Sequence, residues 1–140
     1  MHKYFIFSLF LAFAACSSLP HGTKEYFSYT AAGNEKVTNA SFISYDSPSF
    51  RSMLQKRSSV QIVDVRTPKE YAAGHIDKAI QISVTEKDFL DNCIKQLDRK
   101  KPVAVYCKGG VRSRNAAKLL VQNGFKVYNL DKGYDDWIKE

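Results

Sequence analysis

The chain has few of the residues that build metal sites, cross-links or redox centres. Its 140 residues include only three cysteines and three histidines, and His75 is the only histidine after residue 39. A zinc or iron site needs several such ligands, so no metal and no other cofactor is expected. The sequence also lacks a phosphate-binding nucleotide loop and a Cys-x-x-Cys redox motif.

No apolar run is long enough to cross a bilayer. The longest one, residues 4–15, has 12 residues, whereas a membrane-spanning helix needs about 20. It follows a short basic start at Lys3 and has the length of the apolar region of a signal peptide. A buried core helix, the alternative, would show a polar face, which this run lacks. We therefore predict that residues 1–15 are an export signal.

The apolar run ends in Phe13-Ala14-Ala15-Cys16, which resembles the lipobox of bacterial lipoproteins. In that family the cysteine after two small residues is lipidated and becomes the first residue. The resemblance implies an exported protein of the cell envelope, lipid-anchored through Cys16 on the periplasmic or other extracytoplasmic side of a membrane. Two or more acyl chains anchor a protein stably. An Ala-x-Ala cleavage that releases a free protein is the alternative.

The region after Cys16 is rich in Ser, Gly, Thr, Asn and Lys, without a sustained period. It predicts a tether over residues 16–39, followed by one domain over residues 40–140. Loss of Lys3 with the signal lowers the net charge from +7 to +6. A basic surface facing anionic lipid head groups accounts for this charge. No nucleic-acid motif accompanies it, so nucleic acid is not an expected partner.

Strand and helix patterns alternate from residue 40 onward. Apolar and β-branched segments predict strands at residues 42–45, 60–65, 79–82, 103–106 and 125–130. Helical spacing, a cap at Ser47, and capping boxes at Thr67-Glu70 and Ser83-Glu86 predict helices. These helices cover residues 47–55, 68–73, 86–97, 115–122 and 134–139. This alternation predicts an α/β domain with a five-stranded, mostly parallel sheet and helices on both faces.

A cysteine follows the strand at 103–106 and opens a glycine-rich segment that leads into a helix. In parallel sheets ligands bind beyond the carboxyl ends of the strands, where this cysteine lies. Glycines let the loop curl tightly, and a curled loop at a helix start directs N–H groups toward an anion. Such surroundings favour the thiolate, the nucleophilic form. We predict Cys107 as the nucleophile; the anion-binding residues are Lys108, Gly109, Gly110, Val111, Arg112 and Ser113. An ordinary glycine-rich turn is the alternative.

The third cysteine, Cys93, falls in the predicted helix at residues 86–97. It is expected to be a packed helix residue. A disulfide between Cys93 and Cys107 is the alternative, because exported domains often contain one.

Four segments of the domain resemble a single-domain rhodanese, in order and at family-like spacing. They are Ile62-Val63-Asp64-Val65-Arg66, Glu70-Tyr71 through Gly74-His75-Ile76, Val105-Tyr106-Cys107 through Gly110-x-Arg112-Ser113, and Gly133-Tyr134-x-x-Trp137. Where many members have Pro-Gly after the His-Ile pair, this chain has Asp77-Lys78.

The resemblance implies a rhodanese-like fold and a thiosulfate sulfurtransferase-type enzyme that acts without a cofactor as a monomer. Cys107 would take sulfur from a small anionic donor and pass it to a thiol or cyanide. Arg112 would orient the loop or bind the anion, and Lys108 would attract it. Asp64 and Arg66 would form a charge network that supports the loop. His75 would be a packed, hydrogen-bonding residue.

Two other functions remain open at this point. Related folds include phosphatases and arsenate reductases, which use a Cys-x5-Arg loop. From Cys107 to Arg112 the spacing is Cys-x4-Arg, and the shorter ring of donors suits sulfur better than phosphate, although Arg114 keeps the alternative open. The other alternative is a membrane-tethered rhodanese-like binding module, but inactive modules usually lack the loop cysteine.

Overall fold

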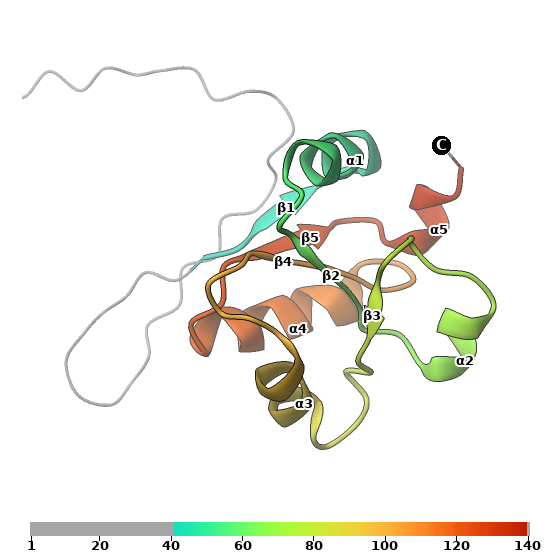
Figure 1. The fold of residues 1–140 in the computed structure, drawn as a ribbon. Helices are drawn as coiled ribbons and strands as arrows, with labels where there is room; N and C mark the ends of the chain where they lie inside the picture. The colour runs from blue at the N-terminus through green and yellow to red at the C-terminus, as the bar shows by residue number, and fades with distance from the viewer. Residues whose placement is uncertain (1–40, 140) are drawn as a thin grey trace, which may run out of the picture.

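The computed structural model describes residues 41–139. The predicted signal peptide, the lipidation site at Cys16 and the tether at residues 16–39 lie outside the described residues. Within residues 41–139, no helix is both long and apolar enough to span a membrane. The described residues form one sheet with helices on either side of it (Figure 1).

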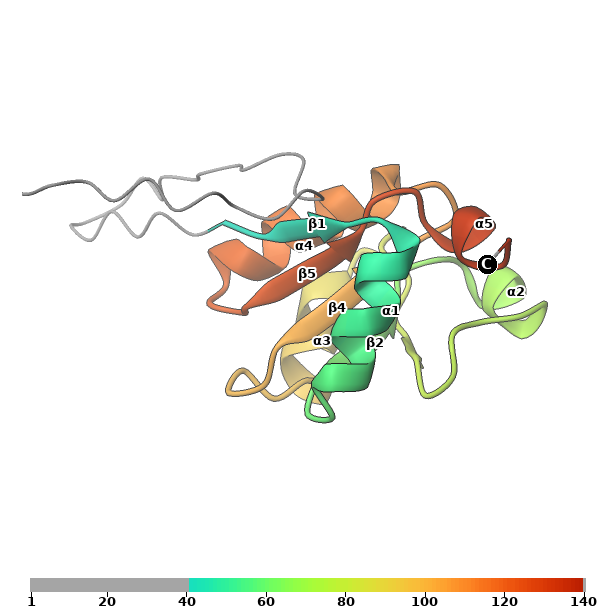
Figure 2. The same cartoon turned by 90° about the horizontal axis from the view of Figure 1, so that it is seen from above.

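The strands of this part of the chain form one parallel sheet, seen from two directions in Figures 1 and 2. They are β1 (Ile43–Tyr45), β2 (Gln61–Asp64), β3 (Ile80–Gln81), β4 (Val103–Tyr106) and β5 (Val127–Leu130). Their order across the sheet is β1-β5-β4-β2-β3, so β4 is the central strand. Every residue of β4 is buried, as its continuous apolar sequence requires. The predicted α/β fold is confirmed, and every strand pair is parallel.

Helices cover both faces of the sheet. They are α1 (Ser47–Lys56), α2 (Pro68–Ala72), α3 (Phe89–Gln96), α4 (Val111–Gln122) and α5 (Tyr134–Trp137). Helices α3 and α4 lie on one face, and α1 lies on the other (Figure 1). The two short helices, α2 and α5, each follow the carboxyl end of a strand. They therefore lie at the edge of the sheet where Cys107 leaves β4.

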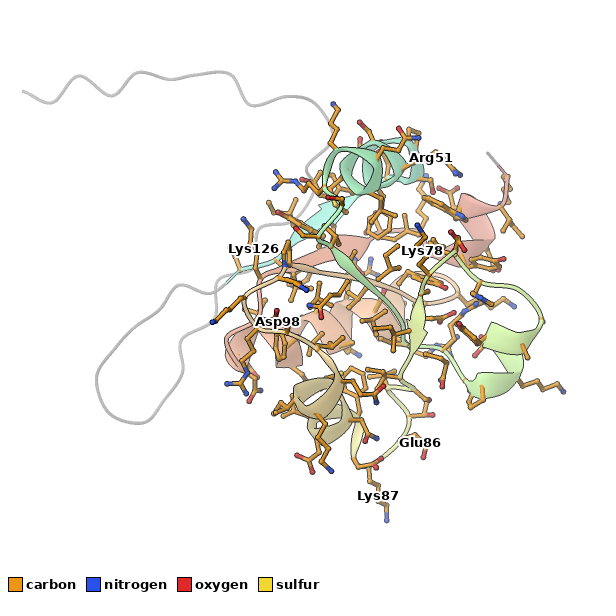
Figure 3. The ribbon with its side chains drawn as sticks, in the orientation of Figure 1. Arg51, Lys78, Glu86, Lys87, Asp98 and Lys126 are labelled. Carbon is orange, nitrogen blue, oxygen red and sulfur yellow. The ribbon has the colours of Figure 1, made fainter. Side chains whose placement is uncertain are left out.

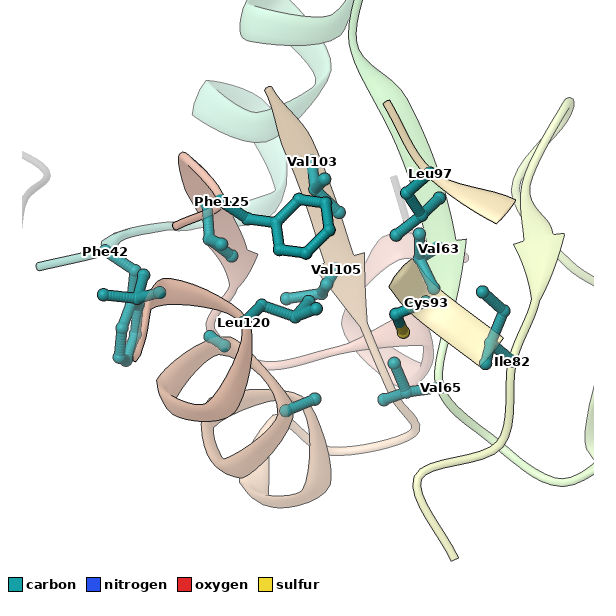
Figure 4. Close-up of a cluster of buried hydrophobic side chains, with 14 of the residues drawn as sticks. Phe42, Val63, Val65, Ile82, Cys93, Leu97, Val103, Val105, Leu120 and Phe125 are labelled. Carbon is teal, nitrogen blue, oxygen red and sulfur yellow. The ribbon is translucent and has the colours of Figure 1, made fainter. Parts of the chain in front are cut away.

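Side chains of β4 alternate between two apolar clusters. Val103 and Val105 face the cluster under α3 and α4 (Figure 4). Ala104 and Tyr106 face the cluster that includes Phe50 of α1. This alternation is the period of two expected for a strand covered on both faces.

Most predicted boundaries agree with the structure to within two residues, but two helix starts do not. Helix α4 begins at Val111, four residues before the predicted start, because Gly110 ends the loop and the chain turns into helix directly after it. Helix α3 begins at Phe89, three residues late. The predicted cap at Ser83 is wrong, since its hydroxyl lies 2.8 Å from that of Thr85 in a local turn.

The other caps follow the sequence more closely. Thr67 and Glu70 form the predicted capping box at the start of α2. At α1 the cap is Asp46, one residue before the predicted Ser47, and its carboxylate accepts the Ser49 N–H at 3.0 Å. Hydrogen bonds from the side chain and then the backbone N–H of Ser49 lower the pKa of Asp46.

Candidate active site

Cys107 lies directly after the central strand β4, at the carboxyl edge of the sheet. The residue is only 1% exposed, and its Sγ accepts a hydrogen bond from the Gly110 N–H at 3.1 Å. Lys108, Gly109 and Val111 are exposed. The sulfur is therefore buried, while three of the residues that follow it are exposed to solvent.

The first turn of α5 binds the carbonyl groups at the start of this loop. The Tyr134 N–H donates to the Cys107 carbonyl at 2.7 Å, and the Asp135 N–H donates to the Lys108 carbonyl at 3.1 Å. Gly133 allows this close approach: it has a φ of 68°, and a Cβ there would collide with both carbonyl oxygens. The N–H groups at the start of α5 thus hold two carbonyls of the loop.

The first turn of α4 binds the other end of the loop. The Arg114 N–H and the Ser113 hydroxyl both donate to the Gly110 carbonyl, at 3.1 and 3.0 Å. Gly110 has a φ of 92°, and a Cβ there would collide with the backbone carbonyl of Asp131. The Arg114 guanidinium also pairs with the Asp131 carboxylate at 2.9 Å. The connection between β5 and α5 therefore fixes the loop at both ends.

Several backbone N–H groups of the loop and the α4 start remain unpaired. Within residues 41–139 no acceptor binds the N–H of Lys108, Gly109, Val111, Arg112 or Ser113. The carbonyls of Cys107, Lys108 and Gly110 accept hydrogen bonds from α4 and α5, whereas these N–H groups of the same loop have no partner. They coincide with the positive end of α4. This arrangement can stabilise a small anion or a charged persulfide.

Arg112 is bound by a carboxylate that the sequence did not single out as its partner. Its Nη1 and Nη2 donate to the two Glu70 oxygens, at 2.8 and 2.7 Å. The Thr67 N–H and hydroxyl also donate to Glu70, at 3.0 and 2.9 Å. The hydrogen bond from Arg112, aided by Thr67 and opposed by partial burial, lowers the pKa of Glu70 to about 2. The pair ties α4 to α2 and occupies both terminal nitrogens of Arg112.

Asp64 and Arg66 form the expected charge network, which reaches the loop through α5. Arg66 Nη2 lies 2.6 Å from Asp64 Oδ2, and both residues are buried. Burial opposes the charge of Arg66, but the hydrogen bonds and charge of Asp64 outweigh it and raise the pKa of Arg66. The guanidinium lies 4.3 Å from the ring centre of Tyr134, whose N–H binds the Cys107 carbonyl. Among the described residues, neither Asp64 nor Arg66 hydrogen-bonds to residues 107–113.

The remaining candidates are not part of this loop. Cys93 is a buried, free thiol in α3, and burial raises its pKa to about 12. Cys107 is also free, so the alternative disulfide is not formed. His75 is exposed but stacks on Tyr71, with 3.8 Å between ring centres, and its Nδ1 lies 3.0 Å from the Tyr71 carbonyl oxygen. Residues 41–139 contain no group of three or more His, Cys, Asp or Glu arranged for a metal.

Comparison with known families assigns the domain. The family described as "Rhodanese-like domain" matches residues 47–140. The chain belongs to the rhodanese family. Cys107 therefore follows the central strand of a rhodanese domain.

Two curated relatives are called "Thiosulfate sulfurtransferase GlpE". The one from Shewanella oneidensis is 39% identical over 85 residues, which cover 60% of this chain and 81% of the relative. The one from Coxiella burnetii is 38% identical over 85 residues, covering 60% and 77%.

Solved rhodanese structures show the same fold. A rhodanese-related protein from Thermoplasma volcanium is 30% identical with a TM-score of 0.60, covering 69% of this chain and 90% of that one. A rhodanese-like domain protein from Staphylococcus aureus is 31% identical with a TM-score of 0.60, covering 67% and 89%. The human single-domain sulfurtransferase TSTD1 is 26% identical with a TM-score of 0.57, covering 69% and 96%.

Proposed function

We propose that this rhodanese-family protein is a sulfurtransferase that carries sulfane sulfur on Cys107. One observation carries the proposal: α4 and α5 bind the carbonyls of the loop that follows Cys107, one loop N–H donates to the buried sulfur, and other N–H groups of the loop are unpaired. A thiolate and a persulfide both carry negative charge, and both gain from such donors. The two curated relatives named as thiosulfate sulfurtransferases support the same chemistry.

The first half of the reaction loads the cysteine. Cys107 loses its proton, and the thiolate attacks the outer sulfur of thiosulfate. A new S–S bond forms on Cys107 while the S–S bond of thiosulfate breaks, and sulfite leaves with the electron pair. The product is a Cys107 persulfide anion. The N–H groups of the loop would stabilise its charge without any rearrangement.

The second half returns the cysteine to its starting state. A nucleophilic acceptor, cyanide or a thiolate, attacks the outer sulfur of the persulfide. The S–S bond to Cys107 breaks and the thiolate is restored, so donor and acceptor react in turn through one covalent intermediate. No cofactor takes part, because each step breaks one S–S bond and forms one S–S or S–C bond.

The charged side chains around the loop have separate roles. Exposed Lys108 attracts the anionic donor. Arg112 is held by Glu70 and orients the start of α4, which favours the orienting role over direct anion binding. Asp64 and Arg66 position Tyr134 and, through it, the Cys107 carbonyl.

The structure weakens the phosphatase and arsenate reductase alternative. Such enzymes need a guanidinium directed at a tetrahedral oxyanion. Here Arg112 is paired with Glu70 and Arg114 with Asp131, at 2.7 and 2.9 Å. Both arginines that follow Cys107 are therefore occupied. A membrane-tethered binding module remains the other alternative, and it would not need Cys107.

We also propose that the protein is exported and lipid-anchored at Cys16, on the extracytoplasmic side of a membrane, and that it acts as a monomer. The sequence of residues 13–16 supports the anchor. Bacterial expression with a radiolabelled fatty acid tests it: label should enter the wild type and not Cys16→Ser. Equal labelling of both would refute lipidation at Cys16.

Turnover tests the sulfurtransferase directly. The chain without residues 1–16 is incubated with thiosulfate and cyanide, and thiocyanate release is measured. We expect turnover in the wild type and none in Cys107→Ala, with Cys93→Ala as the matched control that stays active. Absence of thiocyanate, together with hydrolysis of an aryl phosphate that depends on Cys107, would instead establish the phosphatase.

A further inference from the structure

Six exposed cations gather at the end of the domain opposite Cys107. They lie at the end of α1, in the α3–β4 connection and before β5, and they are Lys56, Arg57, Arg99, Lys100, Lys101 and Lys126. We call these residues the basic end. All three segments lead into strands of a parallel sheet, so they meet at its amino edge. Cys107, by contrast, follows a strand at the carboxyl edge.

Hydrogen bonds join the three segments of the basic end. The Gln61 N–H donates to the Pro102 carbonyl, and the Val103 N–H donates to the Lys126 carbonyl, both at 2.9 Å. The Gln61 side chain also binds the backbone of Asp98. Figure 3 shows Asp98 and Lys126 on the same side of the molecule. The cations are therefore neighbours in the fold, although they come from distant parts of the sequence.

Little negative charge offsets these cations. Asp98 is the only acidic residue in residues 56–60, 98–102 and 123–126, and it lies 3.8 Å from Lys101. Arg57 and Lys126 both lie over the ring of Tyr128, at 5.8 and 5.9 Å, so aromatic contacts help to hold them. The basic end thus presents a group of positive charges to solvent.

The chain enters the domain at this same end. Residues 41 and 42 precede β1, whose amino end lies at the same edge of the sheet as those of β2, β4 and β5. In Figures 1 and 2 the ribbon of β1 begins on that side, while α2 and α5 lie on the other. The apolar run at residues 4–15 therefore connects to the domain through the basic end.

We infer that the basic end binds the anionic head groups of the membrane, so that the Cys107 loop faces away from the lipid. This inference rests on the proposed lipid anchor at Cys16, which would hold the domain near the membrane. Lys and Arg near an anionic membrane surface are attracted to its head groups, and the position of the six cations beside the entry of the chain distinguishes them from an ordinary solvated face. Helix α4 spans the two ends with 12 residues, or about 18 Å. This distance keeps the loop open to soluble donors and acceptors.

Vesicle binding by the full chain tests the surface. The probes are vesicles of phosphatidylcholine with and without phosphatidylglycerol, at low and high salt. We expect that R99E/K100E/K101E weakens binding to the anionic vesicles at least about tenfold and that salt removes the difference. The control K69E/K87E/K139E makes the same change in net charge at exposed positions outside the basic end, and it should bind nearly as the wild type does.

A second set of variants guards against misfolding. K56Q/R57Q/K126Q removes the other three charges without reversing them and should weaken anionic binding severalfold. Thermal unfolding reports whether each variant is folded, and it depends neither on lipid nor on sulfur transfer. Equal loss of binding in the control variant would show that only net charge matters, and unchanged binding in both basic-end variants would show that this surface does not meet lipid. Either result would overturn the inference.

Tryptophan fluorescence tests the orientation. Trp137 is the only tryptophan and lies in α5, at the Cys107 end, packed on Phe50 and Arg51. On vesicles with a spin-labelled head group, its emission should stay unquenched. The variant Ser58→Trp adds a tryptophan in the turn after α1, at the basic end, and the added emission should be quenched. Quenching of Trp137 without quenching at residue 58 would place the Cys107 end on the membrane and refute the orientation.

Discussion

Arg112 shows how a neighbouring residue determines the role of a site residue. By sequence, an arginine separated from a nucleophilic cysteine by four residues could bind the donor or orient the loop. The Glu70 carboxylate takes both terminal nitrogens, and Thr67 in turn holds Glu70. The anion is then left to the backbone N–H groups and to Lys108, which suits a small donor. The contact joins residues 42 positions apart, so no local pattern could predict it.

The Glu70–Arg112 pair predicts a pH-dependent stability. Since the pKa of Glu70 is lowered from 4.5 to about 2, its contribution is fully present above pH 4.5 and is lost as the pH falls toward 2. Glu70→Gln should therefore reduce the free energy of unfolding at pH 6 by on the order of 1–2 kcal/mol, discounted for partial exposure. Urea denaturation measures the free energy of unfolding of both proteins at pH 6 and near pH 2. The difference between the variant and the wild type should be smaller near pH 2 than at pH 6.

Glu86→Gln is the matched control for this prediction. Glu86 is exposed, and its side chain has no hydrogen bond or ion pair among the described residues. It should change stability by less than about 0.5 kcal/mol at either pH. A Glu70→Gln deficit that persists unchanged near pH 2 would mean that the variant disturbs packing rather than removing an ion pair.

Lys78 occupies a backbone conformation that suits glycine. Its φ is 63°, the only positive value among the described residues other than glycine, and many family members have glycine at this point of the motif. Left-handed backbone costs an L residue about 1–2 kcal/mol, while glycine costs about 0.4–1 kcal/mol in unfolded-state entropy. Lys78→Gly should therefore raise the free energy of unfolding by about 0.5–1 kcal/mol. Urea denaturation measures this free energy, and the control variant Asp77→Gly should lower it. A loss of stability in Lys78→Gly would contradict the account.

At the scale of elements, the sequence predicted regular segments better than their starting points. The strand at residues 103–106 was predicted correctly because a buried central strand is apolar at every position. The pattern puts the start of α4 four residues too late, because it treats Arg112 and Ser113 as part of the loop. They belong to the first helical turn, where their N–H groups are unpaired. The helix start is therefore itself part of the candidate site.

The two glycines of the Cys107 loop should differ sharply on substitution. Gly110 has a positive φ, and a Cβ there would collide with the Asp131 carbonyl. A Cβ at Gly109 would meet no atom within 4 Å. Gly110→Ala should lower the free energy of unfolding by about 3 kcal/mol or more, from strain and collision together. Gly109→Ala should change it by less than about 1 kcal/mol. Thermal or urea unfolding measures both, and similar values for the two variants would argue against the close approach of the β5–α5 connection.

At the scale of the whole molecule, four short motifs were enough to predict the family and the sheet. Their spacing follows from strands and helices that must alternate to bury both faces of a parallel sheet. The strand order, β1-β5-β4-β2-β3, was not predictable in this way, because apolar patterns do not state which strands are neighbours. That order brings α5 beside Cys107 and brings the basic end together. The support of the loop and the grouping of the six cations are therefore properties of the fold.

The central claim is that Cys107 carries sulfur within a cradle of backbone N–H groups. Intact-mass measurement of the chain without residues 1–16, after thiosulfate and before any acceptor, tests it most directly. We predict that the wild type gains the mass of one sulfur atom, that cyanide removes it, and that Cys107→Ser gains none although Cys93 is still present. A wild type that gains no sulfur, or a Cys107→Ser variant that gains one, would contradict the account.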